Sequence, residues 1–233
     1  VLLKNKGGLL PLNPEDRIAV IGDFAQTPRY QGAGSSMVNA PKVDSFLQVF
    51  EQSGLKTVGF AKGFDRYGKP DAALQAEAVK LAEKAETVLL FLGLDEVKES
   101  EGLDRSDMKL AKNQIDLLLA VHRVNPHLIV ILSCGSAIET NWQSHCQALV
   151  WAGLGGQAGA GAVLDVLTET EFLTQLSELG VIVLMFSAGM GTDIQELKHS
   201  GKAGFLVALL GVMVPLVMGT ALAWGADQWG LIE

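Results

Sequence analysis

The chain has 233 residues, which is enough for one large domain or for a domain with an added segment. Hydrophobic residues make up 48% of the sequence and charged residues 19%, so the chain can bury a sizeable core. The formal net charge is −8, and because an acidic chain repels phosphate backbones, we expect no nucleic-acid partner.

Short apolar runs alternate with segments of helical periodicity between residues 17 and 167. The runs predict buried strands, and apolar side chains at helical spacing predict helices. We expect strands at 17–22, 57–60, 87–93, 127–132 and 148–151, and helices at 43–53, 71–85, 112–124 and 159–167. Because the strands are apolar throughout, the pattern predicts an α/β fold with a doubly wound, mainly parallel sheet that helices cover on both faces.

Ligands of such sheets bind at the carboxyl ends of the strands, which directs attention to the loops after Gly22, Gly93 and Leu132. The loop after Gly93 is dense in carboxylates, which suit general acid–base chemistry. An ordinary solvated acidic loop is the alternative interpretation. Residue chemistry alone leaves three equal candidates for an acid or base, namely Glu96, Glu99 and Glu101.

The two cysteines, Cys134 and Cys146, lack the spacing of a zinc site. We expect both to be buried thiols of a protein in a reducing compartment. The sequence predicts neither a metal ion nor an organic cofactor.

The composition changes after Leu167. Residues 172–188 are mostly apolar, and residues 203–226 carry no charge over a length that could cross a bilayer, for which about 20 residues are needed. This part predicts two hydrophobic, transmembrane helices and membrane association through residues 172–226. A buried helix of a soluble protein is the alternative.

Motifs spread over the first 167 residues resemble, in order, the C-terminal domain of family 3 glycoside hydrolases of the β-glucosidase type. The opening segment 1–12 is similar to the link between that family's two main domains. Arg29-Tyr30-Gln31-Gly32-Ala33-Gly34-Ser35-Ser36 resembles its Gly/Ser loop beside the sugar, and Ser100-Glu101-Gly102-Leu103-Asp104-Arg105 its acid/base loop. Further matches are Leu110, Gln114, Trp142 and the turn 155–159, whereas Ala111 stands where the family often has Pro.

The resemblance implies a retaining hydrolase of β-linked glucosides or similar glycosides, with Glu101 as general acid and then general base. Arg29, Tyr30, Ser35 and Ser36 would shape one wall of the sugar site. Arg105 would bind there too, or fix the loop by pairing with Asp104 or another loop carboxylate.

The family's nucleophile is an aspartate of an N-terminal barrel, which is not in this chain. A retaining mechanism needs both carboxylates, so we expect the chain to be inactive alone and to need that barrel as a partner for a β-glycoside substrate. The expected domains are a linker at 1–16, the hydrolase-like domain at 17–167 and a hydrophobic helical tail at 168–233.

Residues 172–198 resemble a second family, the Kef-type monovalent cation:proton antiporters, within a match of about 60 residues. The intramembrane acidic residues that carry ions in that family have no counterpart here, so the alternative function is a non-catalytic antiporter fragment.

The simplest explanation of the two halves is a joined or truncated reading frame with its junction near 167–171. A membrane-tethered domain is the second explanation. A third hypothesis is a sugar-binding or scaffold domain that completes its site only with a barrel partner. We expect a cytoplasmic hydrolase part if no upstream signal exists, and a membrane location if the tail inserts.

Overall fold

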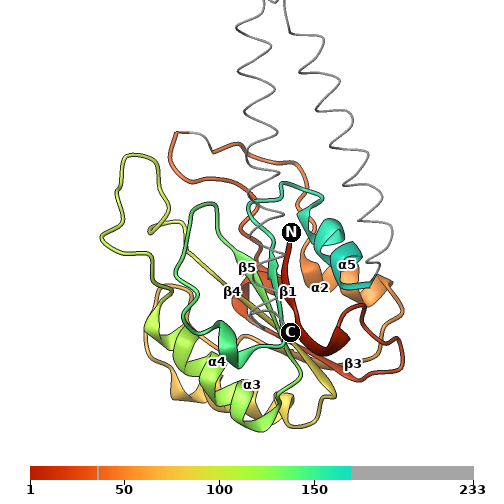
Figure 1. Ribbon diagram of the computed structural model, residues 1–233. Coiled ribbons are helices and arrows are strands. Elements are labelled where there is room, and N and C mark those ends of the chain that lie inside the picture. Colours follow the sequence, from red (N-terminus) through yellow and green to blue (C-terminus); the bar gives the residue numbers. More distant parts are fainter. Residues whose placement is uncertain (36, 169–233) are drawn as a thin grey trace, which may run out of the picture. The chain divides into compact units, whose positions relative to one another are not determined.

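A computed structural model of the chain describes residues 1–35 and 37–168, which form an α/β domain around a six-stranded sheet (Figure 1). The strands are β1 (Leu2–Asn5), β2 (Ile18–Ile21), β3 (Thr57–Ala61), β4 (Thr87–Gly93), β5 (Leu128–Ser133) and β6 (Ala148–Trp151). The helices are α1 (Asp23–Gln26), α2 (Phe46–Gln52), α3 (Ala72–Ala82), α4 (Lys112–Val124) and α5 (Gly159–Thr168), with short 3-10 turns η1 (Lys6–Gly8) and η2 (Gln143–His145).

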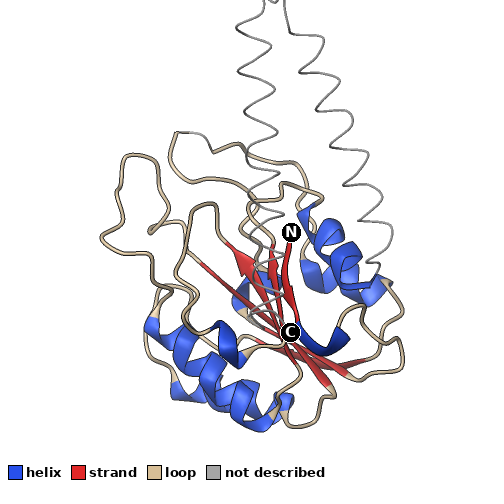
Figure 2. Ribbon diagram, in the orientation of Figure 1, coloured by secondary structure: helices blue, strands red, loops and turns tan. Residues whose placement is uncertain are grey.

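The sheet has the strand order β1-β6-β5-β4-β2-β3, and every neighbouring pair except β1 with β6 is parallel. Helices α3 and α4 pack together on one face of the sheet, and α2 and α5 pack together on the other (Figure 2). Each residue of β4 and β5 is buried, as expected for strands covered on both faces. The prediction of a mainly parallel α/β sheet is therefore confirmed.

Strand β1, which sequence patterns did not predict, lies within the expected linker segment 1–16. It pairs antiparallel with β6 at the edge of the sheet, and the backbone N–H of Trp151 donates to the carbonyl of Val1 at 2.8 Å. Leu3 of this strand remains 53% exposed, so main-chain hydrogen bonds rather than burial hold it in place. Backbone pairing of this kind leaves little trace in an apolar pattern, which explains why sequence analysis missed it.

Strand β2 lies between β3 and β4, so the connections that leave β2 and β4 diverge to opposite sides. This is a topological switch point, the place where sheets of this class form a crevice for ligands. The segment 22–45 after β2, which contains α1, and the loop 94–111 after β4 border it. Both loops carry residues that sequence analysis predicted for the site.

The helices predicted within 172–226 lie outside the described residues. Over residues 1–35 and 37–168, none of the helices combines the length and the apolar character that crossing a bilayer requires.

Gln114 of α4 fixes the end of the central strand β4. Its side chain is buried at 1% exposure, donates to the carbonyl of Gly93 and accepts from the N–H of Gly93, both at 2.9 Å. The amide thus satisfies two buried backbone groups at the point where the site loop leaves the sheet. Each would lose a partner if the amide were removed.

We predict that Gln114→Leu lowers the free energy of unfolding by about 2 kcal/mol or more, because two buried backbone groups lose their hydrogen bonds. Urea denaturation of the chain followed by circular dichroism measures this. Gln52→Leu at the exposed end of α2 is the matched control and should have almost no effect. Equal stability of the two variants would contradict the assignment.

Candidate active site

The loops after β2 and β4 are joined by a short parallel bridge between Ala33 and Ser100. The backbone N–H of Glu101 donates to the carbonyl of Ala33 at 3.0 Å. Gly34 has φ +101°, and a Cβ added there would lie 2.8 Å from the Cβ of Glu101. Only glycine therefore fits at this crossing, which brings the Gly/Ser loop directly against the predicted acid/base loop.

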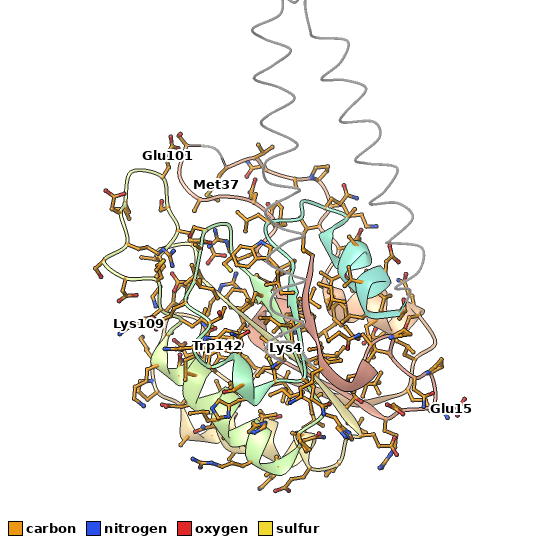
Figure 3. All side chains as sticks on the ribbon, in the orientation of Figure 1. Lys4, Glu15, Met37, Glu101, Lys109 and Trp142 are labelled. Carbon is orange, nitrogen blue, oxygen red and sulfur yellow. The ribbon has the colours of Figure 1, made fainter. Side chains whose placement is uncertain are left out.

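The loops after β2 and β4 form a rim at the carboxyl edge of the sheet. Glu101 is exposed on this rim, close to Met37 in Figure 3. Its Oε2 atom accepts a hydrogen bond from the backbone N–H of Ser35 at 3.0 Å and another from the Ser35 hydroxyl. The structure thus brings together two predicted site residues, one from each loop. Ser36 lies outside the described residues.

Glu99, two positions earlier, has a different environment, since its side chain is only 9% exposed. The carboxylate accepts from the backbone N–H groups of Gly135, at 3.0 and 3.1 Å, and Ser136, at 2.7 Å, and from the Ser136 hydroxyl. Its Oε2 atom lies 3.4 Å from Nη2 of Arg29. Glu99 therefore connects the loops that follow β2, β4 and β5.

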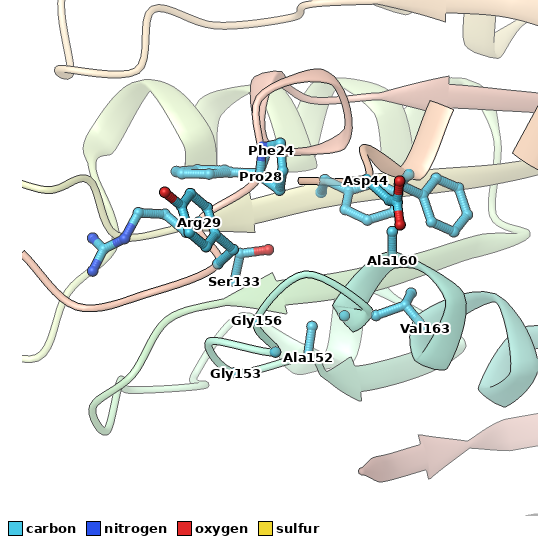
Figure 4. Close-up of a pocket in the computed structure, with 15 residues that line it drawn as sticks. Phe24, Pro28, Arg29, Asp44, Ser133, Ala152, Gly153, Gly156, Ala160 and Val163 are labelled. Atoms are coloured by element: carbon cyan, nitrogen blue, oxygen red, sulfur yellow. The ribbon is translucent and has the colours of Figure 1, made fainter. Parts of the chain in front are cut away.

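Arg29 is buried at 4% exposure, although sequence analysis placed it on the sugar wall. Its Nη1 donates to the carbonyl of Leu94 at 3.0 Å, and Nη2 faces Glu99. In Figure 4 its guanidinium points away from Asp44, on the opposite side of the pocket drawn there. The contacts of Arg29 in this structure are thus with the loops themselves.

Glu96, the third candidate carboxylate, is held by Arg66 through two hydrogen bonds of 2.6 and 3.1 Å. Arg66 also donates to Asp23 at 2.7 Å and lies 4.4 Å from the ring centre of Phe24. Arg66 was not among the predicted site residues, although its position in the loop after the parallel strand β3 was a usable signal. Burial alone would raise the pKa of Glu96, but the hydrogen bonds from Arg66 outweigh it and lower that pKa.

Tyr30 and Arg105 also make contacts within the loops. The Tyr30 hydroxyl accepts from the Gln31 amide at 2.9 Å, and that amide closes the loop by pairing with both backbone groups of Val38 at 2.9 Å. Arg105 donates to the carbonyl of Ala137. The expected pairing of Arg105 with Asp104 or another loop carboxylate is absent among the described residues.

A pocket on the α2 and α5 side of the sheet encloses about 40 Å³, which holds a few water molecules rather than a sugar ring (Figure 4). Glu101 does not line it. Within the described part of the chain, no cluster of three or more His, Cys, Asp or Glu side chains is arranged for a metal ion.

Both cysteines are free and buried, as predicted. Burial, reinforced by the negative charge of Glu99, raises the pKa of Cys134 to about 12. The thiol of Cys134 is therefore uncharged at neutral pH and unsuited to nucleophilic attack.

The fold and the paired loops define an α/β domain with a carboxylate site at its topological switch point. The sequence matches the family described as glycosyl hydrolase family 3 C-terminal domain over residues 1–171, and the chain belongs to this family.

Curated relatives support the assignment. The chain is 38% identical over 170 residues to the thermostable beta-glucosidase B of Acetivibrio thermocellus. The aligned region covers 72% of this chain and 22% of that protein. It is 43% identical over 225 residues to an exo-alpha-(1->6)-L-arabinopyranosidase of Bifidobacterium breve, covering 92% of this chain and 29% of that protein. The chain thus spans less than a third of the length of these relatives.

Among solved structures, the domain is similar to the GH3 beta-glucosidase of Bifidobacterium adolescentis. The TM-score is 0.69 and the identity 43%, over 72% of this chain and 25% of that one.

A second family, described as sodium/hydrogen exchanger, transmembrane, matches residues 148–233. The match covers less than half of the chain and overlaps the first family. The narrower Kef-type resemblance rests on this match alone, and the residues that carry it lie outside the described ones.

We predict a pH dependence of stability that comes from Glu96. Because the pKa of Glu96 lies below its ordinary value of 4.5, the charged pair with Arg66 stabilises the fold above that pH, and this contribution disappears as the pH falls through the folded-state pKa. Between about pH 5 and pH 3 the wild type should lose more free energy of unfolding than Glu96→Gln. Parallel pH profiles of the two proteins would contradict the argument.

We also predict that Gly34→Ala separates the two loops, because its Cβ would meet Glu101 and φ is +101°. Hydrogen exchange of the Glu101 amide should become about tenfold faster, since its bond to Ala33 breaks. Gly161→Ala is the control, because a Cβ there meets nothing within 4 Å. Unchanged Glu101 exchange in Gly34→Ala would show that the close approach is absent in solution.

Proposed function

We propose that this domain supplies the general acid/base, Glu101, of a retaining β-glycosidase whose nucleophile belongs to a barrel domain outside this chain. One observation carries the proposal: Glu101 and the Gly/Ser loop, which match two motifs of the family, are hydrogen-bonded across the switch point. Relatives of the same family carry glycosidase names. Residues 17–167 are assigned to this domain.

The proposed chemistry uses one carboxyl group in two roles. Glu101 first protonates the oxygen of the leaving group while the barrel aspartate attacks the anomeric carbon. It then removes a proton from the water that releases the sugar from that aspartate. The two carboxyl groups must lie about 5–5.5 Å apart for this mechanism, so the barrel has to dock against the rim that carries Glu101.

Exposure of the rim supports such docking. Met37, Val97 and Leu103 are 60%, 63% and 60% exposed, and all three belong to the loops at the carboxyl edge of the sheet. Apolar side chains gathered around a polar site commonly mark an interaction surface. A docked barrel would cover them and exclude water from Glu101.

Ser35 has a supporting role in the proposal. Its N–H and hydroxyl hold Glu101 before the substrate arrives, and its hydroxyl can then bind a sugar hydroxyl. The substrate class is β-linked glucosides or similar glycosides, and the mechanism itself needs neither a metal nor an organic cofactor.

We predict that the full chain, mixed with an N-terminal barrel domain of a family 3 glycoside hydrolase, releases nitrophenol from an aryl β-glucoside. Glu101→Gln should lower this rate about 10²–10⁴-fold, because proton transfer is lost. Glu83→Gln on the exposed end of α3 is the matched control and should retain the rate.

Azide supplies a further check, because this anion attacks the glycosyl-enzyme without help from a general base. With an activated leaving group it should restore turnover of Glu101→Gln and give the glycosyl azide. An inactive wild-type mixture, or a Glu101→Gln variant as fast as the wild type, would overturn the proposed function.

A further inference from the structure

We propose that Glu99 is a positioning residue, whose buried carboxylate fixes the loop 94–111 so that Glu101 meets the substrate. This inference rests on the proposed function, since it assigns the second glutamate of the same loop a role in that chemistry. The proton itself belongs to Glu101. Glu99 acts through the backbone between the two residues.

The partners of Glu99 come from two other loops. The backbone N–H groups of Gly135 and Ser136 and the Ser136 hydroxyl donate to its carboxylate from the loop after β5. Arg29 belongs to the loop after β2, and its Nη2 atom lies 3.4 Å from Oε2 of Glu99. The side chain of Arg29 is only 1% exposed. A carboxylate that accepts this many hydrogen bonds has little capacity left to bind a substrate.

The geometry transmits this hold to Glu101. Arg29 lies four positions before Ala33, and Glu99 lies one position before Ser100, while Ala33 and Ser100 form the bridge between the loops. The ion pair and the bridge are thus successive cross-links between the same two segments. Glu101 follows directly, and its own N–H is bound to Ala33. Its backbone therefore has little freedom while Glu99 stays in place.

Removing the charge would release this arrangement. In Glu99→Gln an amide NH₂ replaces one carboxylate oxygen and would face donors at Gly135 and Ser136. Arg29 would also be left as a buried cation without its counter-ion. A displacement of about 1 Å at a catalytic group can lower the rate about 10²-fold.

The first test measures hydrogen exchange in the full chain. Glu99→Gln should speed exchange of the Glu101 amide about tenfold and leave the amides of β4 unchanged. Glu96→Gln, which alters the other ion-paired glutamate of the loop, should change the Glu101 amide by less than about twofold. Unchanged Glu101 exchange in Glu99→Gln would overturn the inference.

The second test separates positioning from proton transfer in the mixture with the barrel. Glu99→Gln should lower kcat about 10²-fold with KM within about threefold, and it should keep the basic limb of the pH–rate profile, because Glu101 still carries the proton. Glu101→Gln should lose that limb. If Glu99→Gln lost the limb and Glu101→Gln kept it, Glu99 would be the proton carrier and the inference would be wrong.

Ser136→Ala serves as a milder variant, because it removes one donor from Glu99 without uncovering a charge. It should give a smaller change of the same kind, about three- to tenfold in kcat, even if Glu99→Gln destabilises the whole domain. An effect of Ser136→Ala on stability with none on Glu101 exchange would contradict the inference. If the wild-type mixture is inactive, the proposed function fails, and the exchange measurement still decides the role of Glu99.

Discussion

The buried contact between Arg29 and Glu99 is the interaction on which the arrangement of the site depends. It adds a buried charged contact between the loops after β2 and β4, which also meet at the bridge between Ala33 and Ser100 and through the hydrogen bonds of Ser35 to Glu101. A buried ion pair adds little net stability compared with apolar packing, but losing one partner is costly. Its main effect here is geometric, because it fixes the segment that leads into Glu101.

The sheet supplies the frame for this contact. Strands β4 and β5 are buried throughout, which fixes the positions of their ends. The side-chain amide of Gln114 forms hydrogen bonds with both backbone groups of Gly93, the last residue of β4. The strand order then puts two long loops on either side of one crevice. The candidate site therefore lies on loops, and the sheet and the side chains that bind the loops to it fix their positions.

The sequence predicted the central strands and α2 to α5 well, because apolar runs and helical spacing report burial directly. It could not rank Glu96, Glu99 and Glu101. Their environments depend on partners that are 30, 36 and 66 positions away, at Arg66, the backbone of Gly135 and Ser35, respectively. Strand β1 was not predicted for a related reason, because its position depends on backbone hydrogen bonds to β6, which is distant in the sequence. Burial follows from local pattern, whereas the role of a charged side chain follows from the tertiary fold.

The roles of Glu101 and Glu99 can be tested in a crystal structure of the full chain bound to the barrel and to an uncleaved substrate analogue. We expect a Glu101 oxygen about 2.6–3.2 Å from the glycosidic oxygen, with Glu99 still bound by Arg29 and the Gly135–Ser136 backbone. A complex in which Glu99 has left those partners and approaches the glycosidic oxygen, while Glu101 faces solvent, would contradict these roles.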